Sequence, residues 1–248
     1  MTQSVPHTIN EMKNKLKEII KKIIPKKIVE IIRDARNSYN TTKRRGRVGG
    51  FDVLSIYNGH FNVKYRGVPA LKCPFDYVLY QMILSELTPD LVIEIGTSEG
   101  GTALYIADLM DIIGHGVVHT IDKDKRASQL TSKHPRIKLF SEGWEKYDIS
   151  VAKDFPKIMV IDDASHNNTD VLESLKKFSP IVSVGSYFIV EDGIVTRIER
   201  EKSLQGGPLK AVHDFVKNNQ DFKIDRKYCD FFGKNATFNP DGYLKRIK

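Results

Sequence analysis

From Leu91 onward, short apolar segments alternate with segments whose apolar residues recur every three or four positions. The first pattern is typical of buried strands and the second of helices. Their alternation predicts a parallel α/β sheet, because parallel strands need a crossover connection, usually a helix. The predicted strands cover residues 91–95, 117–121, 137–140, 158–161 and 187–190, and the predicted helices lie near 102–113, 169–178 and 209–218.

The tail of the chain has a different pattern. Residues 222–226 and 236–238 resemble two strands that are close in sequence. We therefore expect an antiparallel pair at one edge of the sheet, which is a common mixed arrangement.

The positive charge of the chain is confined to its beginning. The formal net charge is +8, yet residues 1–47 hold thirteen Lys and Arg against four acids, and the remainder holds 26 basic and 27 acidic residues. The α/β part is therefore close to neutral. This argues against a basic groove across it and hence against a nucleic-acid substrate.

The basic segment has a helical pattern over residues 9–37, interrupted by Pro25. Residues 40–46 resemble a linker, so we expect a basic amphipathic helical extension over 1–45 and an α/β domain over 46–248. The apolar stripe of the extension must be buried. An anionic membrane surface and a homo-oligomer contact both suit lysine-flanked helices, and the sequence leaves both open.

The cellular setting follows from what the sequence does not contain. No apolar run approaches the roughly 18–20 residues of a spanning helix, and lysines interrupt the N-terminal apolar residues throughout, unlike a secretory signal. The two cysteines, Cys73 and Cys229, are too few for a disulfide framework. We expect a cytoplasmic protein, with peripheral contact at the inner face of the membrane as one alternative.

The strongest motif is residues 91–102, LVIEIGTSEGGT, where an apolar strand enters a glycine-bearing loop before a helix. Gly96 allows a turn and a close approach by a ligand, and Gly100 and Gly101 let the helix start against the sheet. A pyrophosphate prefers bare amides at this position. The carboxylate of Glu94 instead suits a cationic ligand such as the methionine end of S-adenosylmethionine.

A second acid, Asp122, ends the next predicted strand. An acid at the tip of this strand can accept hydrogen bonds from both hydroxyls of a ribose. The alternative is that Glu94 and Asp122 merely cap adjacent helices. Two acids at consecutive strand tips beside a glycine loop favour the ligand interpretation.

Two more strands end in carboxylates, Asp162-Asp163 and Glu191-Asp192. Their carboxyl ends should lie side by side, where open α/β folds bind ligands. Carboxylates that converge there repel one another unless a cation lies among them. Oxygen ligands select a hard ion, Mg²⁺ or another divalent cation.

His166 follows Asp163 closely enough to face the same substrate. It could remove a hydroxyl proton whose pKa a metal lowers. The alternative is a residue at the start of a helix, beside the possible caps Ser165 and Asn167. The six other histidines have no comparable setting.

Several separated segments together resemble the cephalosporin hydroxylase family over roughly residues 50–248. They are residues 73–81 (CPFDYVLYQ), the Glu94 loop, the Asp163/His166 segment, the Glu191-Asp192 pair and residues 237–244 (TFNPDGYL). The family is similar to the metal-dependent sugar O-methyltransferases. The resemblance implies a Rossmann-like class I methyltransferase fold, a mostly parallel seven-stranded sheet with an antiparallel C-terminal edge.

The resemblance also implies roles for individual residues. The S-adenosylmethionine site would comprise Glu94, Gly96, Thr97, Ser98, Gly100, Gly101, Asp122, Gly143 and Trp144, with Asp122 at the ribose and Gly143-Trp144 near the adenine. The metal would be held by Asp163, Glu191 and Asp192. The catalytic residues would be His166, as the base, and Asp163. Ser165 departs from relatives that carry an acid before the histidine. Asp162 could therefore compete with Asp163, and the spacing to His166 favours Asp163.

The function implied is metal-dependent transfer of the methyl group of S-adenosylmethionine to a sugar hydroxyl, in a surface polysaccharide or a glycosylated natural product. One alternative is an oxygenase, as the family's name suggests, but that chemistry wants two histidines and one carboxylate on a β-rich barrel. Another is a non-catalytic binding protein of the same fold. Calorimetry with S-adenosylmethionine, with and without Mg²⁺, would separate a binding protein from a metal-dependent enzyme.

Overall fold

The computed structural model describes residues 52–198 and 204–248. The predicted helical extension, its helices over 9–37 and the boundary at residues 45 and 46 lie outside these residues. Residues 53–248 form one compact unit.

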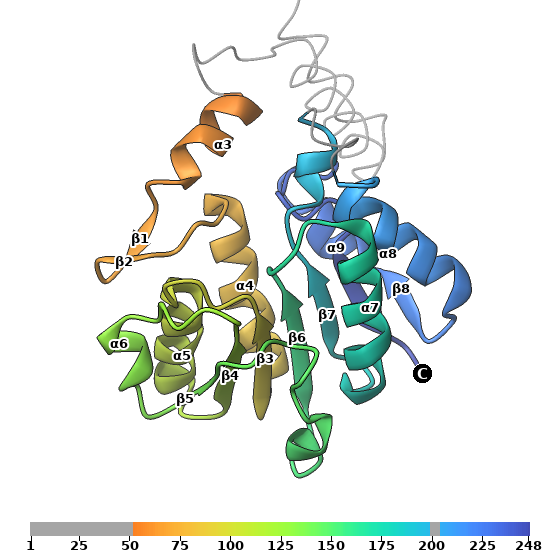
Figure 1. Ribbon diagram of the computed structural model, residues 1–248. Coiled ribbons are helices and arrows are strands. Elements are labelled where there is room, and N and C mark those ends of the chain that lie inside the picture. The colour runs from red at the N-terminus through yellow and green to blue at the C-terminus, as the bar shows by residue number, and fades with distance from the viewer. Residues whose placement is uncertain (1–51, 199–203) are drawn as a thin grey trace, which may run out of the picture. The chain divides into compact units, whose positions relative to one another are not determined.

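A seven-stranded sheet forms the centre of this unit (Figure 1). Its order is β5-β4-β3-β6-β7-β9-β8, with the first five strands parallel and β9 antiparallel to both β7 and β8. The strands are β3 (Leu91–Ile95), β4 (Val117–Ile121), β5 (Ile137–Phe140), β6 (Ile158–Asp162), β7 (Tyr187–Val190), β8 (Phe222–Ile224) and β9 (Tyr243–Arg246). The predicted parallel sheet with an antiparallel C-terminal edge is confirmed.

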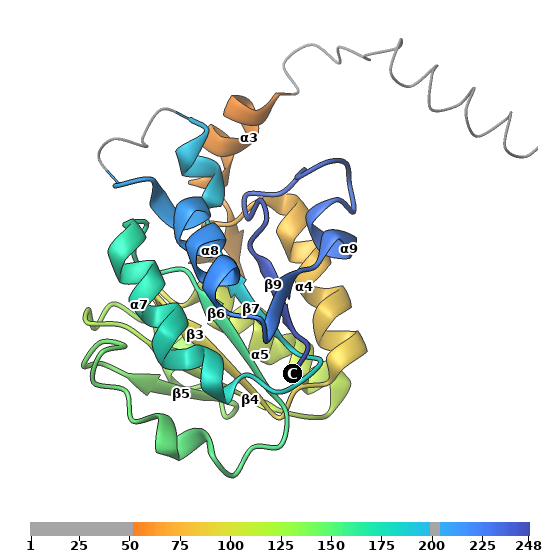
Figure 2. The same ribbon diagram turned by 90° about the vertical axis from the view of Figure 1, so that its right-hand side faces the viewer.

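Helices cover both faces of the sheet, as parallel strands require. The apolar residues of β3 alternate: Leu91, Ile93 and Ile95 pack with α7 (Asn168–Phe178) and α8 (Gly207–Asn218). Val92 packs on the opposite face with α4 (Pro74–Leu87) and α5 (Gly101–Ile113). Figure 2 shows α7 and α8 on one side of the strands and α4 on the other.

Short elements complete the described chain. They are α3 (Val53–His60), a hairpin of β1 (Lys64–Tyr65) and β2 (Val68–Pro69), α6 (Gln129–Ser132), α9 (Arg226–Cys229) and 3-10 turns at Ile149–Ala152, Ser179–Ile181 and Gly193–Thr196. Among the described residues, no helix has the length and apolar character needed to cross a membrane.

The predicted strand at 236–238 is wrong, because the last strand is β9. Thr237 donates its hydroxyl to the buried carboxylate of Asp76, and the Phe238 amide donates to the same group at 3.1 Å. The segment is therefore held by α4 and not by a neighbouring strand. The predicted strand 222–226 ends early, at Ile224, because Asp225 caps α9 by accepting from the Lys227 amide.

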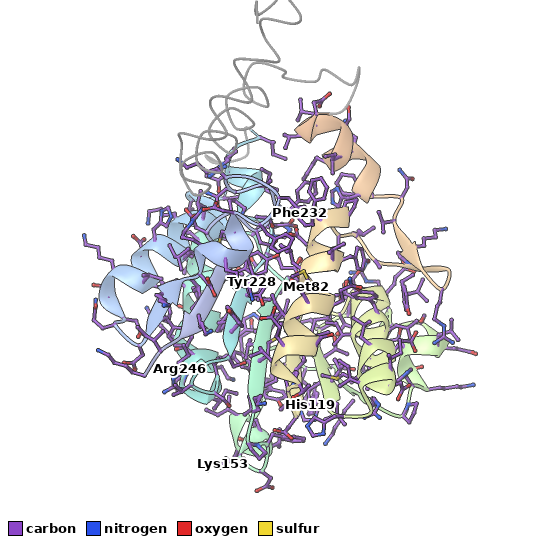
Figure 3. The ribbon with its side chains drawn as sticks, turned by 180° about the vertical axis from the view of Figure 1, so that it is seen from behind. Met82, His119, Lys153, Tyr228, Phe232 and Arg246 are labelled. Atoms are coloured by element: carbon purple, nitrogen blue, oxygen red, sulfur yellow. The ribbon has the colours of Figure 1, made fainter. Side chains whose placement is uncertain are left out.

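The α9 segment supports the outer side of α4. Tyr228 donates its hydroxyl to Glu86 at 2.8 Å, near the end of α4. Phe232 stacks on Phe75 at the start of α4, with ring centroids 5.1 Å apart. Figure 3, seen from behind, shows α4 lying across the face of the sheet with Tyr228 and Phe232 beside it. This support fixes the helix whose Tyr80 reaches the candidate site.

Candidate active site

A cavity of about 640 Å³ opens at the carboxyl ends of the parallel strands. Open α/β sheets bind their ligands at this edge. Ten of the predicted site residues line it: Gly96, Thr97, Ser98, Gly101, Asp122, Gly143, Trp144, Asp163, His166 and Asp192. Glu94, Gly100 and Glu191 do not line it.

The glycine loop after β3 lies against two other segments. At Gly96, where φ is +102°, a Cβ would lie 2.3 Å from the carbonyl oxygen of Asp163. At Gly101, a Cβ would lie 2.1 Å from the carbonyl oxygen of Pro69. The loop therefore approaches the tip of β6 and the hairpin more closely than a side chain would allow. The space that a side chain would take is therefore filled by neighbouring backbone, and the loop borders the cavity.

Asp122 follows β4 and lines the cavity. Its Oδ2 accepts the Ser98 amide at 2.7 Å, and its Oδ1 accepts the Asp124 amide at 3.0 Å. Each carboxylate oxygen has a second lone pair. The bonds thus orient the carboxylate and leave acceptors for two ribose hydroxyls.

Glu94 lies on the α4/α5 face of β3 and is only 1% exposed. Its Oε2 accepts the Thr120 hydroxyl at 2.5 Å, and Thr120 is bonded in turn to Thr97 at 2.7 Å. Burial raises the pKa of Glu94 to about 8. Glu94 therefore supports the loop through these two threonines, and its direct contact with a ligand stays a prediction.

The neighbours Asp162 and Asp163 have different environments. Asp162 ends β6 on the α7/α8 face, where its carboxylate accepts the hydroxyl of Ser174. Asp163 follows the strand and lines the cavity. Burial raises the pKa of both carboxyls, that of Asp162 to about 7. The geometry supports the choice of Asp163 over Asp162 as a ligand.

Lys72, which no sequence motif singled out, places its ammonium beside the carboxylates of Glu191 and Asp163. It donates to both oxygens of Glu191, and its Nζ lies 3.5 Å from Oδ2 of Asp163. Burial alone would lower the pKa of Lys72, but the negative charges of Glu191 and Asp163 raise it above its ordinary value. Burial, followed by the charge of Asp163, raises the pKa of Glu191 to about 7. No local pattern identifies such a lysine, because its partner Glu191 is 119 residues away.

His166 lies opposite Asp192, with 3.3 Å between Nε2 and Oδ2. Burial raises the pKa of Asp192 to about 6, although His166 opposes the shift. The alternative role of His166, as a residue that starts a helix, has no support in the geometry of α7. Asn167 is the residue that caps this helix, and its side chain accepts from the Thr169 amide at 2.9 Å. His166 is therefore available to a ligand in the cavity.

His60 also lines the cavity, contrary to the expectation that none of the other six histidines has a setting comparable with that of His166. Its Nδ1 is bonded to the carbonyl of Tyr57, and burial lowers its pKa. The neutral imidazole is therefore favoured. Only the placement of α3 over the sheet edge brings this histidine to the site.

Another group of metal-binding residue types lies elsewhere on the described surface: Asp108, Asp111 and His134, with ligand atoms within 4.8 Å of one another. Arginines already neutralise its carboxylates, since Arg66 pairs with Asp108 and Arg136 with Asp111. The predicted set of Asp163, Glu191 and Asp192 stays a prediction as a metal site. Its hard oxygen donors Asp163 and Asp192 face the cavity beside Glu191.

The last strand of the sheet inserts antiparallel between its neighbours, and a ligand cavity covers the carboxyl ends of the parallel strands. This architecture, with acids and a histidine lining the same cavity as a glycine loop, is that of the class I methyltransferases. The Rhamnosyl O-methyltransferase/CmcI family model matches residues 58–247. The chain belongs to this family, and the resemblance to cephalosporin hydroxylases is confirmed.

Curated relatives agree with this assignment. The Rhamnosyl O-methyltransferase of Mycobacterium tuberculosis (strain ATCC 25618 / H37Rv) is 33% identical over 192 residues, covering 73% of this chain and 77% of the relative. The Rhamnosyl O-methyltransferase of Mycobacterium leprae (strain TN) is 29% identical over 201 residues, covering 77% and 87%.

Solved structures of CmcI are similar in fold. One with SAH is 22% identical and has a TM-score of 0.58, and the match covers 84% of this chain and 91% of that chain. One with Mg and SAM is 24% identical, has a TM-score of 0.56 and shares 84% of each chain. They confirm the predicted α/β methyltransferase fold and not the β-rich barrel expected of an oxygenase.

Proposed function

We propose that this protein transfers the methyl group of S-adenosylmethionine to a hydroxyl of a sugar, with Mg²⁺ or another divalent cation bound at Asp163, Glu191 and Asp192. The observation that carries the proposal is that one cavity contains both the glycine loop with Asp122 and the Asp163–His166–Asp192 group. The relatives named rhamnosyl O-methyltransferase make a rhamnosyl residue the first acceptor to test.

The donor end of the cavity is formed by the loops after β3, β4 and β5. Asp122 orients a ribose, the loop with Gly96 and Thr97 borders the methionine portion, and Trp144 offers an apolar surface near the adenine. Bound there, S-adenosylmethionine supplies the electrophilic methyl group, and the divalent cation supplies positive charge that lowers the pKa of the acceptor hydroxyl. Orientation of the two reactants accounts for much of such a displacement.

The proton of the acceptor hydroxyl goes to His166. A histidine suits this step because its ordinary pKa lies near neutrality. The Asp192 carboxylate, 3.3 Å from Nε2, stabilises the imidazolium that forms. His166 is partly exposed at the cavity, so a sugar hydroxyl can reach it.

The acceptor end has a different lining. Phe61 and Leu71 line the cavity and are 52% and 42% exposed. Ligand pockets commonly combine apolar surfaces with a few polar groups that set orientation. An exposed ring here suits the apolar face of a deoxysugar, with its hydroxyl directed toward His166.

The test is methyl transfer by the purified full-length protein from S-adenosylmethionine to simple rhamnosides, followed by mass spectrometry. We expect a methylated product that requires a divalent ion, and loss of the product in His166→Ala. Full turnover after exhaustive chelation, with no metal found by elemental analysis, would refute the metal assignment. Failure to bind S-adenosylmethionine would refute the enzyme assignment.

We propose that residues 9–37, outside the described residues, bind either an anionic membrane surface or a second copy of the chain. A variant that starts at Gly46 should lose liposome binding but keep methyl transfer to a soluble acceptor if the contact is a membrane. Lysine-driven membrane binding should also weaken as salt rises. Dissociation of that variant into monomers, with no liposome binding by the full chain, would identify an oligomer contact.

A further inference from the structure

Among the described residues, Lys72 is the lysine that is buried: its side chain is only 1% exposed. It lies between β2 and α4, just before Pro74 at the start of the helix. A buried ammonium is costly unless it is paired. Its partners therefore determine what it does.

Those partners are the carboxylates predicted to hold the metal. Both oxygens of Glu191 accept from Nζ, and Asp163 lies 3.5 Å away. Tyr80 adds a hydroxyl bond to Glu191 at 2.5 Å, and its ring centroid lies 5.1 Å from Nζ. Lys72 and Tyr80 thus fix Glu191 from the side of α4.

Without a cation, the carboxylates of this cluster would repel one another in a poorly solvated place. Lys72 supplies one fixed positive charge there. A divalent cation held by Glu191 and Asp163 would share their oxygens with this ammonium at short range. Two like charges so close repel strongly where water is excluded.

We infer that Lys72 is a built-in counter-ion, a positioning residue that keeps the carboxylate cluster assembled without metal and thereby weakens the binding of a divalent cation. The inference rests on the proposed metal site. It predicts opposite effects from the same substitution: removing the charge destabilises the metal-free protein and tightens metal binding. A lysine that only supported the fold would produce the first effect alone.

The test uses full-length Lys72→Met, which retains much of the side-chain length without the charge. Mn²⁺ is the probe, with affinity measured by titration calorimetry and by the free-ion signal in electron paramagnetic resonance. We expect at least about ten-fold tighter Mn²⁺ binding and a lower unfolding midpoint in excess chelator. Saturating Mn²⁺ should raise the unfolding midpoint by more in the variant than in the wild type, because a ligand stabilises the folded state according to its affinity.

Three control variants separate charge from packing. Lys72→Arg keeps the charge and should keep Mn²⁺ affinity within a few-fold of the wild type. Tyr80→Phe removes a bond to Glu191 without changing net charge and should not tighten Mn²⁺ binding. Lys227→Met removes the charge of an exposed lysine paired with Glu86 and should change affinity less than two-fold.

Unchanged or weaker Mn²⁺ binding by Lys72→Met would overturn the inference while leaving the metal site intact. Mn²⁺ binding by none of the proteins would instead contradict the proposed metal-dependent function. A variant that folds with Mn²⁺ but not in chelator would support the inference. One that folds in neither medium would overturn it, since the need for Lys72 would then be independent of the metal.

Discussion

Replacing Gly96 by alanine tests how closely the glycine loop must approach the tip of β6. The substitution introduces two costs. A non-glycine residue at φ +102° pays roughly 1–2 kcal/mol for the left-handed conformation. Its Cβ would also lie 2.3 Å from the Asp163 carbonyl oxygen, and relieving such an overlap costs about 1–3 kcal/mol. We therefore expect Gly96→Ala to lower the free energy of unfolding by about 2–5 kcal/mol, which is a large part of the total for a typical domain.

Two other glycines separate these costs. Gly185 has φ +86° and nothing within 4 Å of an added Cβ, so Gly185→Ala should lose only the conformational part, about 1–2 kcal/mol. Gly101 lacks a positive φ, but its Cβ would lie 2.1 Å from the Pro69 carbonyl. Gly101→Ala should therefore lose only the steric part, about 1–3 kcal/mol.

The assay is urea unfolding followed by tryptophan fluorescence and circular dichroism, with free energies extrapolated to water. S-adenosylmethionine affinity, measured by calorimetry, should fall in Gly96→Ala and stay unchanged in Gly185→Ala, whose site lies outside the cavity lining. If Gly96→Ala costs no more than Gly185→Ala, the close approach of the loop to Asp163 is not a constraint and the reasoning fails.

Asp122→Ala should weaken S-adenosylmethionine binding by about 1–3 kcal/mol, the cost of leaving ribose hydroxyls unpaired, as measured by calorimetry. Unchanged affinity in both Asp122→Ala and Glu94→Ala would contradict the donor site. His166→Ala should lower turnover by about 10²–10⁴-fold and leave donor affinity unchanged, as judged by single-turnover kinetics and calorimetry. An active variant would show that His166 is not the base. Burial and, to a smaller degree, the positive charge of Lys138 lower the pKa of His119 to about 4. As pH falls below 6.5, the unfolded state therefore takes up a proton on this histidine before the folded state does. Wild-type stability should therefore fall between pH 6.5 and 4 by more than that of His119→Phe, and equal slopes in urea unfolding would contradict this.

Much of the fold could be predicted because its signals are local. The parallel strands are buried on both faces, so each forms an apolar run that is visible in the sequence. Four of the five predicted parallel strands match the observed bounds, and β6 is one residue longer, ending at Asp162. The glycine loop was visible for the same reason, since strand, loop and helix follow one another directly.

The tail was harder to predict because its conformation depends on distant groups. Thr237 and Phe238 are bonded to Asp76, which lies on α4 far away in sequence. The apolar and β-branched residues there favoured a strand on local propensity. The hydrogen bonds to a buried carboxylate determined the outcome instead, since an unpaired buried carboxylate is costly.

By itself, the sequence determined the class of sheet, the glycine loop after the first parallel strand and the carboxylates at the strand tips, because each depends on neighbours along the chain. The sequence favoured Asp163 over Asp162 only by its spacing to His166, and the tertiary structure gave the two carboxylates different environments, since the side of the sheet that each faces depends on where β6 ends. It also brought His60 to the cavity and Lys72 to the carboxylates. A buried charge needs a partner in space, and the partner of Lys72 is separated from it by most of the domain.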